Sequence, residues 1–503
     1  MNIPQILDTN FRKLGNQDCL TADGKNWTYS QIKTESELVA AVLQEMGIVK
    51  GDKVAIMSQN TPAFVYSFYG ILKAGGVVVP VNHKLAAPEV DYIISHSESR
   101  ILLFDGSLSE MACKISVPVR KFSIDSFSDS FDQLEKLLDG ARSFKPVEIS
   151  DLDIAEILYT SGTTGKPKGC LHTHRSVVMA GITGALAMKL DEGDRMLMAM
   201  PIWHSSPLNN WFIGIQYVGG TTVLLREYHP VHFLQAIQQE KCTVYFGAPI
   251  SYILPIQMVP QFNDFDLTSM RRWIYGGGPM AADTARLVMR SYKSENFYQV
   301  YGMTEAGPTG TTLFPRDQLA KAGSIGNRAL PGADLRVVRV DGKQAKAGDI
   351  GEIWLQSDSM MVGYYKNPEA TEAAFDGRWY KTGDLARIDE DGYLYIVDRL
   401  KDMIVTGGEN VYSKEVEDAI AGLPGVMEAA VIGKPHVDWG ETVVSFIVPK
   451  KGETLDPEVL KKALSEKLAR YKIPREFNIV DELPHTASGK VMKFRLRDFD
   501  CHK

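Results

Sequence analysis

Short apolar runs rich in β-branched residues alternate with stretches of helical periodicity over most of the chain. Clear examples of these runs are residues 54–58, 76–81, 222–225 and 244–246. Such alternation is typical of sheets covered by helices, because each strand leads into a helix that packs on the sheet. The first part of the chain is therefore expected to be α/β, and 503 residues are enough for several hydrophobic cores.

The pattern changes after about residue 350. Closely spaced short strands follow, with turn signals at Asp376-Gly377 and Asp391-Gly392. Short strands and helical stretches near residues 414–422 and 457–470 then predict a small α+β unit. We expect the boundary before this unit to fall near residues 398–402.

Composition excludes several functional classes. The formal net charge of −7 does not suggest a protein that coats nucleic acid or an anionic membrane. The first residues lack a signal-peptide pattern, and no run reaches the ~18 apolar residues of a membrane span. The cysteines show no CxxC pair and no metal-like spacing, which indicates a reducing compartment: Cys19, Cys113, Cys170, Cys242 and Cys501. We expect a cytoplasmic protein with no nucleic-acid partner and no stable membrane insertion.

The strongest chemical signal is the segment LYTSGTTGKPKG at residues 158–169. Glycines let backbone N–H groups approach an anion, hydroxyls add donors and lysines supply charge, so this loop suits a phosphate group. The expected phosphate ligands are Thr160, Ser161, Gly162, Thr163, Thr164, Gly165, Lys166 and Lys168. Two residues separate Gly162 from Gly165, whereas a Walker A loop has four, which disfavours an ordinary P-loop NTPase.

Further motifs follow in order: YGMTE at residues 301–305, YKTGDL at 380–385, DRLKD at 398–402 and SGK at 488–490. Together with the phosphate loop they resemble the adenylate-forming superfamily of acyl- and aryl-CoA synthetases, luciferases and peptide-synthetase adenylation domains. The resemblance covers nearly the whole chain. It implies an AMP-binding domain at 1–397, with two βαβ-type subdomains and a β-rich subdomain, a hinge at 398–402, and a small mobile α+β domain at 403–503.

The same resemblance, in its acyl-CoA synthetase branch, implies an ATP-dependent acid:CoA ligase. Such an enzyme joins a small-molecule carboxylic acid to AMP, releases pyrophosphate, and passes the acyl group to the thiol of coenzyme A. ATP, Mg²⁺ and coenzyme A are the implied cofactors. The sequence leaves open the identity of the acid, and whether the protein forms a homodimer.

Nucleotide-binding roles follow from these motifs. Glu305 would hold Mg²⁺, a hard cation that prefers oxygen ligands, and Thr304 would hydrogen-bond the α-phosphate. Tyr301 offers a flat ring against the adenine, while Asp384 and Arg399 suit the ribose and phosphate side. The expected nucleotide set outside the loop is Gly276, Gly277, Gly278, Tyr301, Gly302, Met303, Thr304, Asp384 and Arg399.

Lys490 is the expected catalytic cation. Attack of a carboxylate on the α-phosphate brings two anions together, and an ammonium group between them offsets their repulsion. On the other interpretation Lys490 is a solvated surface lysine.

Lys401 occupies the hinge position, and Gly407 and Gly408 would line the path of the pantetheine arm or form an ordinary hairpin turn.

The resemblance implies that His204 gates or contacts the substrate carboxylate, although a lone histidine is more often a packing residue. The acyl pocket is expected to draw on Asn209, Trp211, Ala248, Ser251, Trp273 and Tyr275. These aromatic residues could equally belong to the core. The absence of lysine and arginine between Trp203 and Tyr217 mildly disfavours a second carboxylate in the substrate.

Two other functions fit parts of the sequence. The segment GGGPMA at residues 276–281 satisfies the GxGxxA pattern of dinucleotide oxidoreductases, but that function leaves the phosphate loop and Lys490 unexplained. No carrier domain follows Lys490, which disfavours a modular peptide synthetase, but a stand-alone adenylation enzyme that loads a carrier protein in trans stays open. An inactive relative is disfavoured by the complete set of motifs.

Overall fold

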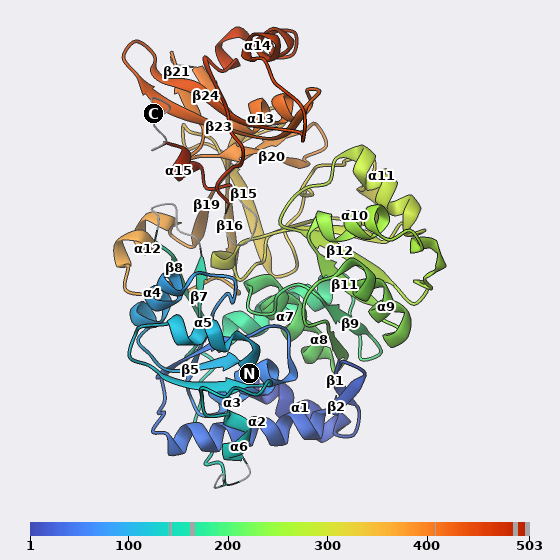
Figure 1. The fold of residues 1–503 in the computed structure, drawn as a ribbon, viewed down its shortest axis with the longest axis vertical. Helices are drawn as coiled ribbons and strands as arrows, with labels where there is room; N and C mark the ends of the chain where they lie inside the picture. Colours follow the sequence, from blue (N-terminus) through green and yellow to red (C-terminus); the bar gives the residue numbers. More distant parts are fainter. Residues whose placement is uncertain (139, 141–142, 161–165, 408, 486–490, 498–503) are drawn as a thin grey trace. The chain divides into compact units, whose positions relative to one another are not determined.

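The computed structural model describes residues 1–138, 140, 143–160, 166–407, 409–485 and 491–497 (Figure 1). The chain divides into two compact units. Among the described residues, the first unit contains those up to 335 and residues 355–380, and the second contains 336–354 and those from 381 onward. Each unit has its own hydrophobic core.

The first unit contains two large sheets. Eight described strands form one sheet in the order β14 (Thr311–Leu313), β13 (Phe297–Tyr301), β12 (Arg272–Gly276), β11 (Val244–Gly247), β9 (Arg195–Met198), β10 (Thr221–Leu224), β1 (Asp18–Ala22) and β2 (Lys25–Thr28). Seven described strands form the other in the order β17 (Gly363–Tyr364), β8 (Lys168–Thr173), β7 (Ile154–Thr160), β4 (Val77–Pro80), β3 (Lys53–Met57), β5 (Ser99–Asp105) and β6 (Arg120–Ile124). We call them the eight-stranded and the seven-stranded sheet.

Helices cover both faces of each sheet (Figure 1). Between the sheets lie α1 (Ile3–Leu14), α2 (Tyr29–Glu45), α3 (Pro62–Lys73), α7 (His174–Met188) and α8 (Ile213–Val218). The outer face of the eight-stranded sheet carries α9 (Pro230–Glu240), α10 (Pro249–Met258) and α11 (Ala282–Ser291). The outer face of the seven-stranded sheet carries α4 (Ala87–Ser97) and α5 (Ser109–Lys114).

Residue alternation along the strands explains these layers. In β3, Val54 and Ile56 face the core between the sheets, whereas Ala55 and Met57 face the core under α4 and α5. A parallel strand buried on both faces needs apolar residues at consecutive positions, which is the run seen in the sequence. The α/β prediction for this part of the chain is confirmed.

A third sheet follows along the chain, and the chain passes between the two units within its strands. Its described strands are β15 (Ala333–Val338), β16 (Ile350–Ser357), β18 (Phe375–Asp376), β19 (Trp379–Ile388) and β20 (Leu394–Arg399). The turns at Asp376-Gly377 and Asp391-Gly392 connect antiparallel neighbours, as the sequence predicts. Helix α12 (Pro368–Ala374) precedes β18, and α6 (Leu134–Leu138) follows β6.

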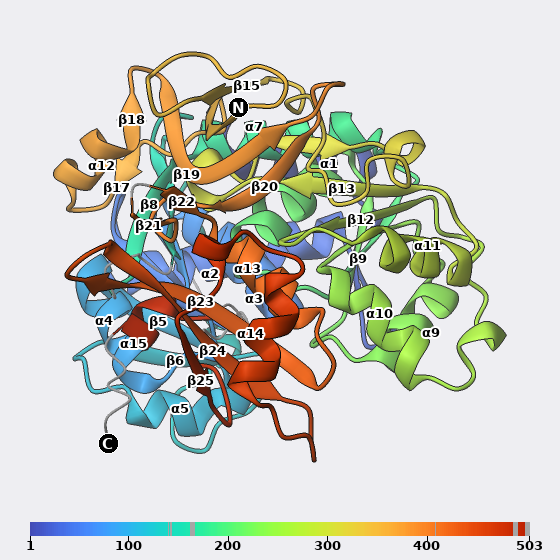
Figure 2. The ribbon, with the colours of Figure 1, turned by 90° about the horizontal axis from the view of Figure 1, so that it is seen from above.

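The second unit carries its own sheet. Its described strands are β21 (Ile404–Thr406), β22 (Glu409–Val411), β23 (Val426–His436), β24 (Gly440–Pro449) and β25 (Glu476–Ile479). Helices α13 (Ser413–Ala421) and α14 (Pro457–Ser465) pack on one face of β23 and β24, and α15 (Lys493–Arg497) packs on the other (Figure 2). Helix α14 ends at Ser465, earlier than the helical stretch expected up to residue 470, and Leu468 contacts the core from the turn that follows the helix.

Short single turns complete the described chain: the 3₁₀ turns η1 (Gly106–Leu108), η3 (Phe262–Asp264), η4 (Thr304–Ala306), η5 (Pro315–Asp317) and η6 (Arg470–Lys472), and the π-helix η2 (Ser206–Phe212). No helix within the described part of the chain is long and apolar enough to cross a membrane.

Candidate active site

The predicted phosphate loop joins two antiparallel strands of the seven-stranded sheet. Thr160 ends β7 and pairs with Lys168, which begins β8. The Lys168 ammonium lies 4.8 Å from the ring centroid of Tyr364, and that of Lys166 lies 5.8 Å from the ring centroid of Tyr92. The loop residues Ser161, Gly162, Thr163, Thr164 and Gly165 lie outside the described residues.

Glu305 lies beside this loop end. The Tyr364 hydroxyl donates a hydrogen bond to Glu305 Oε1 at 3.1 Å, so one phenol contacts both the carboxylate and Lys168. Burial, together with the Glu305 charge, raises the pKa of Tyr364 well above its usual value, which keeps the phenol a donor. The half-buried Glu305 carboxylate also has a second oxygen, and carboxylate oxygens suit Mg²⁺. No cluster of three His, Cys, Asp or Glu side chains that could hold a metal ion occurs in the described chain.

Thr304 is held from two directions. Its carbonyl accepts a hydrogen bond from His172 Nε2 at 2.9 Å, and its hydroxyl lies 2.9 Å from that of Ser205. Burial lowers the pKa of His172 to about 4, so the ring is neutral with its proton on Nε2. The sequence analysis missed His172 and Ser205, whose only signals were their positions in β8 and next to His204.

Predicted adenine-binding residues meet at the ends of two parallel strands. β12 ends at Gly276 and β13 at Tyr301, and Gly276 pairs with Val300 in register. Gly277 has φ +79°, a left-handed conformation that favours glycine, and no heavy atom lies within 4 Å of the Cβ positions of Gly277 and Gly278 among the described residues. The carboxyl edge of a parallel sheet is where α/β folds bind their ligands.

The turn after β13 is tightly packed. A Cβ on Gly302 would lie 2.4 Å from the carbonyl oxygen of Pro308, so this position requires glycine. Met303 packs against a small core cluster that contains Tyr364 and Tyr380. The packing of Gly302 and Met303 therefore fixes the backbone that leads into Thr304 and Glu305.

His204 is exposed, and its ring centroid lies 5.9 Å from that of Trp203. The π-helix η2 follows directly and carries Asn209 and Trp211, both buried. Trp211 stacks on Phe246 of β11 with centroids 5.2 Å apart. One-turn π segments often occur at functional sites.

A cavity of about 10 Å³ lies next to η2, between α7, β13 and the segment near residue 308. Its lining consists of Gly184, Ala187, Met188, Ser206, Asn210, Trp211, Val300, Pro308 and Leu330. A cavity of this size holds about one water molecule. Trp211 is the one predicted acyl-pocket residue among the described lining residues.

The other predicted acyl-pocket residues lie elsewhere. Ala248 and Ser251 are at the start of α10. Trp273 stacks on Phe297 in the core under α9 to α11, and the Tyr275 hydroxyl donates to Gln318 Oε1 at 2.7 Å. Trp273 and Tyr275 thus face the outer side of the eight-stranded sheet, whereas Trp211 packs in the core between the sheets, so the structure does not bring these aromatic residues together.

The second unit brings Asp384 and Arg399 together. They face each other across the β19–β20 ladder, and Arg399 Nε lies 2.8 Å from Asp384 Oδ1. The main chain next to Asp384 is fixed, because Gly383 N donates to Glu352 Oε1 at 2.8 Å and Asp384 N to Thr382 Oγ1 at 3.0 Å. Lys401, two residues after Arg399, has an exposed side chain.

Gly407 packs directly on an aromatic ring. It has φ +60°, its N–H donates to the Trp439 carbonyl at 2.9 Å, and a Cβ would lie 2.8 Å from the indole. Trp439 is 46% exposed, and the Arg475 guanidinium lies 4.5 Å from its ring centroid. Gly408 and Lys490 lie outside the described residues.

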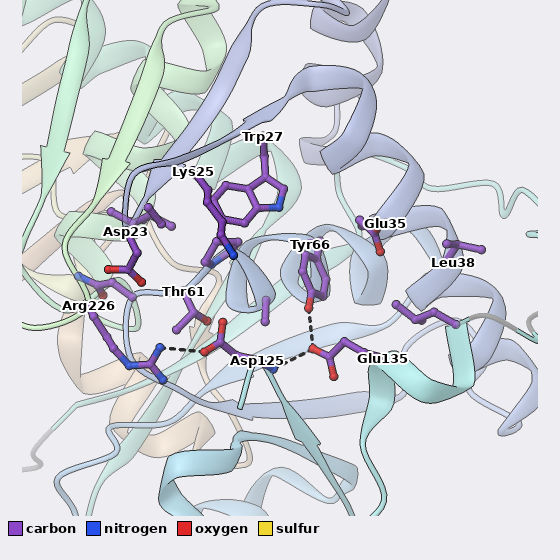
Figure 3. A pocket seen from close by; sticks show the side chains of 16 residues that line it. Asp23, Lys25, Trp27, Glu35, Leu38, Thr61, Tyr66, Asp125, Glu135 and Arg226 are labelled. Atoms are coloured by element: carbon purple, nitrogen blue, oxygen red, sulfur yellow. Dashed lines mark hydrogen bonds and ion pairs between the residues drawn. The ribbon is translucent and has the colours of Figure 1, made fainter. Parts of the chain in front are cut away.

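A larger cavity, of about 580 Å³, lies away from these residues at the carboxyl ends of β1, β3, β6 and β10 (Figure 3). Trp27, Tyr66, Asp125, Glu135 and Arg226 are among its lining residues. Arg226 is paired with Asp105 and Asp125, so the positive charge is neutralised. None of the described residues expected to bind substrate or nucleotide lines this cavity.

The chain is similar to known proteins over nearly its whole length. Residues 7–365 match the family model of AMP-binding enzymes, and residues 415–490 match the AMP-binding enzyme C-terminal domain. A long-chain-fatty-acid–CoA ligase of Mycobacterium tuberculosis is 37% identical over 94% of this chain and 92% of its own length. Feruloyl-CoA synthase of an Amycolatopsis species is 34% identical, covering 94% of each chain.

A solved structure is similar over the same extent. The o-succinylbenzoate CoA synthetase of Bacillus subtilis, in complex with its acyl-adenylate intermediate, has a TM-score of 0.88 and 29% identity, covering 99% of this chain and 98% of that one. Because the family model matches well over half of the chain, the protein belongs to the AMP-binding enzyme family, in its acyl-CoA synthetase branch.

Proposed function

We propose that this protein is an AMP-forming acid:CoA ligase. It uses ATP to convert a carboxylic acid into an acyl adenylate with release of pyrophosphate, and then transfers the acyl group to the thiol of coenzyme A. The observation that carries the proposal is the group formed by Lys168, Tyr364, Glu305 and Thr304 at the end of the phosphate loop. The relatives that align over nearly the whole chain are named as CoA ligases, which supports the reaction class.

In the first step the protein positions two anions and stabilises the charge that develops between them. Lys166, Lys168 and the loop hydroxyls are proposed to hold the ATP phosphates, and Thr304 to donate to the α-phosphate. Glu305 is proposed to bind Mg²⁺, which would offset phosphate charge when bound. Lys490 is proposed to bridge the carboxylate and the α-phosphate, and His204 to contact the carboxylate.

The nucleoside is proposed to lie against Tyr301, with Gly276, Gly277, Gly278, Gly302 and Met303 shaping the turn around the adenine. The open space at the Cβ positions of Gly277 and Gly278 supports close approach of a ring to the backbone. Asp384 and Arg399 are proposed to contact ribose and phosphate, because a carboxylate accepts hydrogen bonds from hydroxyl groups and a guanidinium group donates to phosphate oxygens.

For the second step we propose a rotation of the C-terminal domain about residues 398–402, with Lys401 at the hinge. Gly407 is proposed to border the pantetheine path together with Gly408, because a side chain at Gly407 would collide with Trp439. The exposed Trp439 indole and the neighbouring Arg475 also suit an aromatic base and a phosphate of coenzyme A.

The acyl group is proposed to enter beside η2, which carries Asn209 and Trp211. The cavity of about 10 Å³ borders the same helix. Ala248 and Ser251, at the start of α10, belong to the proposed set as well, whereas Trp273 and Tyr275 on β12 face the other core and are not proposed to contact the acyl group. Transfer to a carrier protein is not favoured. A cytoplasmic location and a homodimer are further proposals, which fractionation and light scattering can test.

The test is a panel of carboxylic acids incubated with protein, ATP and Mg²⁺, with pyrophosphate and AMP measured with and without coenzyme A. We expect coenzyme A to stimulate turnover and acyl-CoA to accumulate, and Lys490→Ala to reduce pyrophosphate release strongly. Lys493→Ala, a lysine paired with Glu417, is the matched control for loss of a nearby charge. Pyrophosphate release with no acylation of coenzyme A would favour a carrier protein, and no release with any acid would remove the ligase proposal.

A further inference from the structure

Glu156 is a carboxyl group buried in the centre of the first unit. Its side chain and that of Asn209 are both fully shielded from solvent. Asn209 Nδ2 donates a hydrogen bond to Glu156 Oε1 at 2.6 Å. Glu156 Oε2 and Asn209 Oδ1 are also buried, and neither oxygen has a hydrogen-bond partner among the described residues. Two adjacent buried acceptors without donors are costly, and they need a physical explanation.

One proton would satisfy both oxygens. A carboxylate only accepts hydrogen bonds, whereas a carboxylic acid also has an O–H donor. With the proton on Oε2, the acid donates to Asn209 Oδ1 while Asn209 Nδ2 donates to Oε1, which closes a ring of two hydrogen bonds. We propose that Glu156 is a neutral carboxylic acid in the folded enzyme and that its paired hydrogen bonds with Asn209 position the π-helix η2 against β7.

The surroundings favour the neutral acid. Burial raises the pKa of Glu156 to about 7, and the hydrogen bond from Asn209 only partly opposes that shift. On β4 the residue in register with Glu156 is the apolar Val78. On β8 the residue in register is His172, which burial keeps neutral because its pKa is lowered to about 4.

Besides His172, β8 and α7 carry the titratable residues Lys168, Cys170, His174 and Arg175, and Arg175 is paired with Asp151 at 2.9 Å. Burial raises the pKa of Cys170 on β8 well above its usual value, and burial lowers the pKa of His174 at the start of α7 to about 4. π-helix η2 contributes the uncharged amides of Asn209 and Asn210. Of these groups, Glu156 is the one expected to change its charge between about pH 5 and about pH 8.

The pair connects two segments that serve the proposed reaction. From Glu156, strand β7 continues to Thr160 at the phosphate loop. Asn209 and Trp211 both lie on η2. Ser205, immediately before η2, contacts Thr304. Loss of the Glu156 proton leaves a buried charge and an Asn209 oxygen without a donor. One of the two hydrogen bonds that position η2 against β7 is therefore lost as the pH rises. This effect on acid binding rests on the proposed function, whereas the protonation state does not.

Three variants test the pair. Glu156→Gln replaces the acid by an amide of the same shape, which still forms two hydrogen bonds with Asn209 but does not titrate. Asn209→Asp places a second acid opposite the first. The double variant E156Q/N209D exchanges acid and amide and restores one proton between them. Glu110→Gln, which removes an exposed carboxylate paired with Lys114, is the matched control.

The first measurement is the infrared difference spectrum between wild type and Glu156→Gln. We expect the carbonyl band of a protonated carboxylic acid near pH 6, lost near pH 8, since a pKa of about 7 lowers the protonated fraction about tenfold over this range. Absence of this band near pH 6 overturns the proposal, whatever reaction the protein catalyses.

The second measurement is the KM for the acid substrate against pH, with kcat measured in parallel. In wild type and Glu110→Gln we expect this KM to rise by up to about tenfold from pH 6 to pH 8 with kcat nearly constant, following the protonated fraction of Glu156. In Glu156→Gln it should stay flat. Asn209→Asp should raise KM across the range, and E156Q/N209D should return it toward the wild-type value.

A protonated carboxyl band combined with identical KM profiles in wild type and Glu156→Gln overturns the positioning role. Failure of the double variant to improve on Asn209→Asp also overturns it. If no acid supports turnover in wild type, the ligase proposal fails, and the infrared band still decides whether Glu156 carries the proton.

Discussion

The hydroxyl of Ser205 lies 2.9 Å from the hydroxyl of Thr304, and the Thr304 carbonyl accepts from His172 at 2.9 Å. Ser205 and His172 are buried, so the contacts that fix Thr304 come from the protein interior. Thr304 therefore presents its hydroxyl from a rigid turn. Such an arrangement suits a donor that must act on a phosphate without reorganising.

Removal of the Thr304 hydroxyl should impair the first half-reaction. A hydrogen bond to a charged group contributes about 1.5–3 kcal/mol, so Thr304→Val should lower kcat/KM for pyrophosphate release by about 10- to 100-fold. Ser205→Ala removes only the neighbour that orients this hydroxyl and should cost a few-fold. Equal losses in the two variants would indicate that Ser205 itself contacts the substrate.

The Asp384–Arg399 pair should contribute to ATP binding. Arg399 is 45% exposed and Asp384 only 7%, so the pair itself adds little stability, whereas loss of the Arg399 bond would shift the Asp384 carboxylate that is proposed to bind the ribose. Asp384→Asn and Arg399→Gln should each raise the KM for ATP by roughly tenfold and leave the KM for the acid unchanged. Steady-state kinetics with each substrate varied in turn checks this. A change confined to the acid KM would contradict the nucleotide role.

The fold was largely predictable from the sequence, because period-two and helical patterns report which faces are buried. Residues 54–58 illustrate this point: Val54 and Ile56 face one core while Ala55 and Met57 face another. The motif that contains Tyr301 and Thr304 was recognisable by its family resemblance, and the structure adds that β12, which ends at Gly276, and β13, which ends at Tyr301, end side by side.

Other parts of the site depend on contacts between residues far apart in the chain. The bonds from His172 to Thr304 and from Asn209 to Glu156 join β8 to η4 and η2 to β7, and short sequence patterns carry no information about such pairs. Trp273 and Tyr275 have the same aromatic character as Trp211, yet the strand pleat directs them to the opposite face of the eight-stranded sheet.

Arg226 should be a major stabilising residue of the first unit. Its guanidinium joins Asp125 at 2.8 Å (Figure 3) and Asp105 at 2.5 Å, and Asp105 is fully buried. Breaking a buried pair leaves an uncompensated charge, so Arg226→Met should lower the free energy of unfolding by about 2–4 kcal/mol after allowance for partial solvent exposure. The shift of the urea midpoint measures this.

The double variant D105N/R226M separates charge from packing. The amide introduced by Asp105→Asn would retain the hydrogen bond that Ser107 N now donates to the Asp105 side chain, without a buried charge. We expect the double variant to recover much of the lost stability. If it is no more stable than Arg226→Met alone, the loss comes from packing around the cavity.

Acid should destabilise the first unit through two buried histidines. Burial lowers the pKa of His172 and that of His174 to about 4, while the unfolded chain binds these protons near pH 6.5. A folded pKa below the unfolded value means that stability is complete above about pH 6.5 and is lost as the pH falls toward about 4. Each histidine should account for up to about 3 kcal/mol of this loss.

Urea midpoints of wild type, His172→Gln and His174→Gln at pH 7 and pH 5 check the sign. Each variant should lose less stability than wild type between these two pH values, because it removes one group that the unfolded chain protonates preferentially. His436→Gln, at the end of β23 in the second unit, is the control. A larger acid loss in the variants than in wild type would contradict the burial argument.

Substitution of Gly407 should separate the two half-reactions. Gly407 has φ +60°, and an added Cβ would lie 2.8 Å from the Trp439 indole, so Gly407→Ala strains the turn and displaces the ring. If this turn borders the pantetheine path, the KM for coenzyme A should rise by about tenfold or more while acid-dependent pyrophosphate release without coenzyme A is retained.

Gly452→Ala controls for backbone strain alone. Gly452 is another left-handed glycine in the second unit, and no described heavy atom lies within 4 Å of its Cβ position. Equal loss of both half-reactions in Gly407→Ala, with Gly452→Ala unaffected, would place Gly407 in the adenylation step instead.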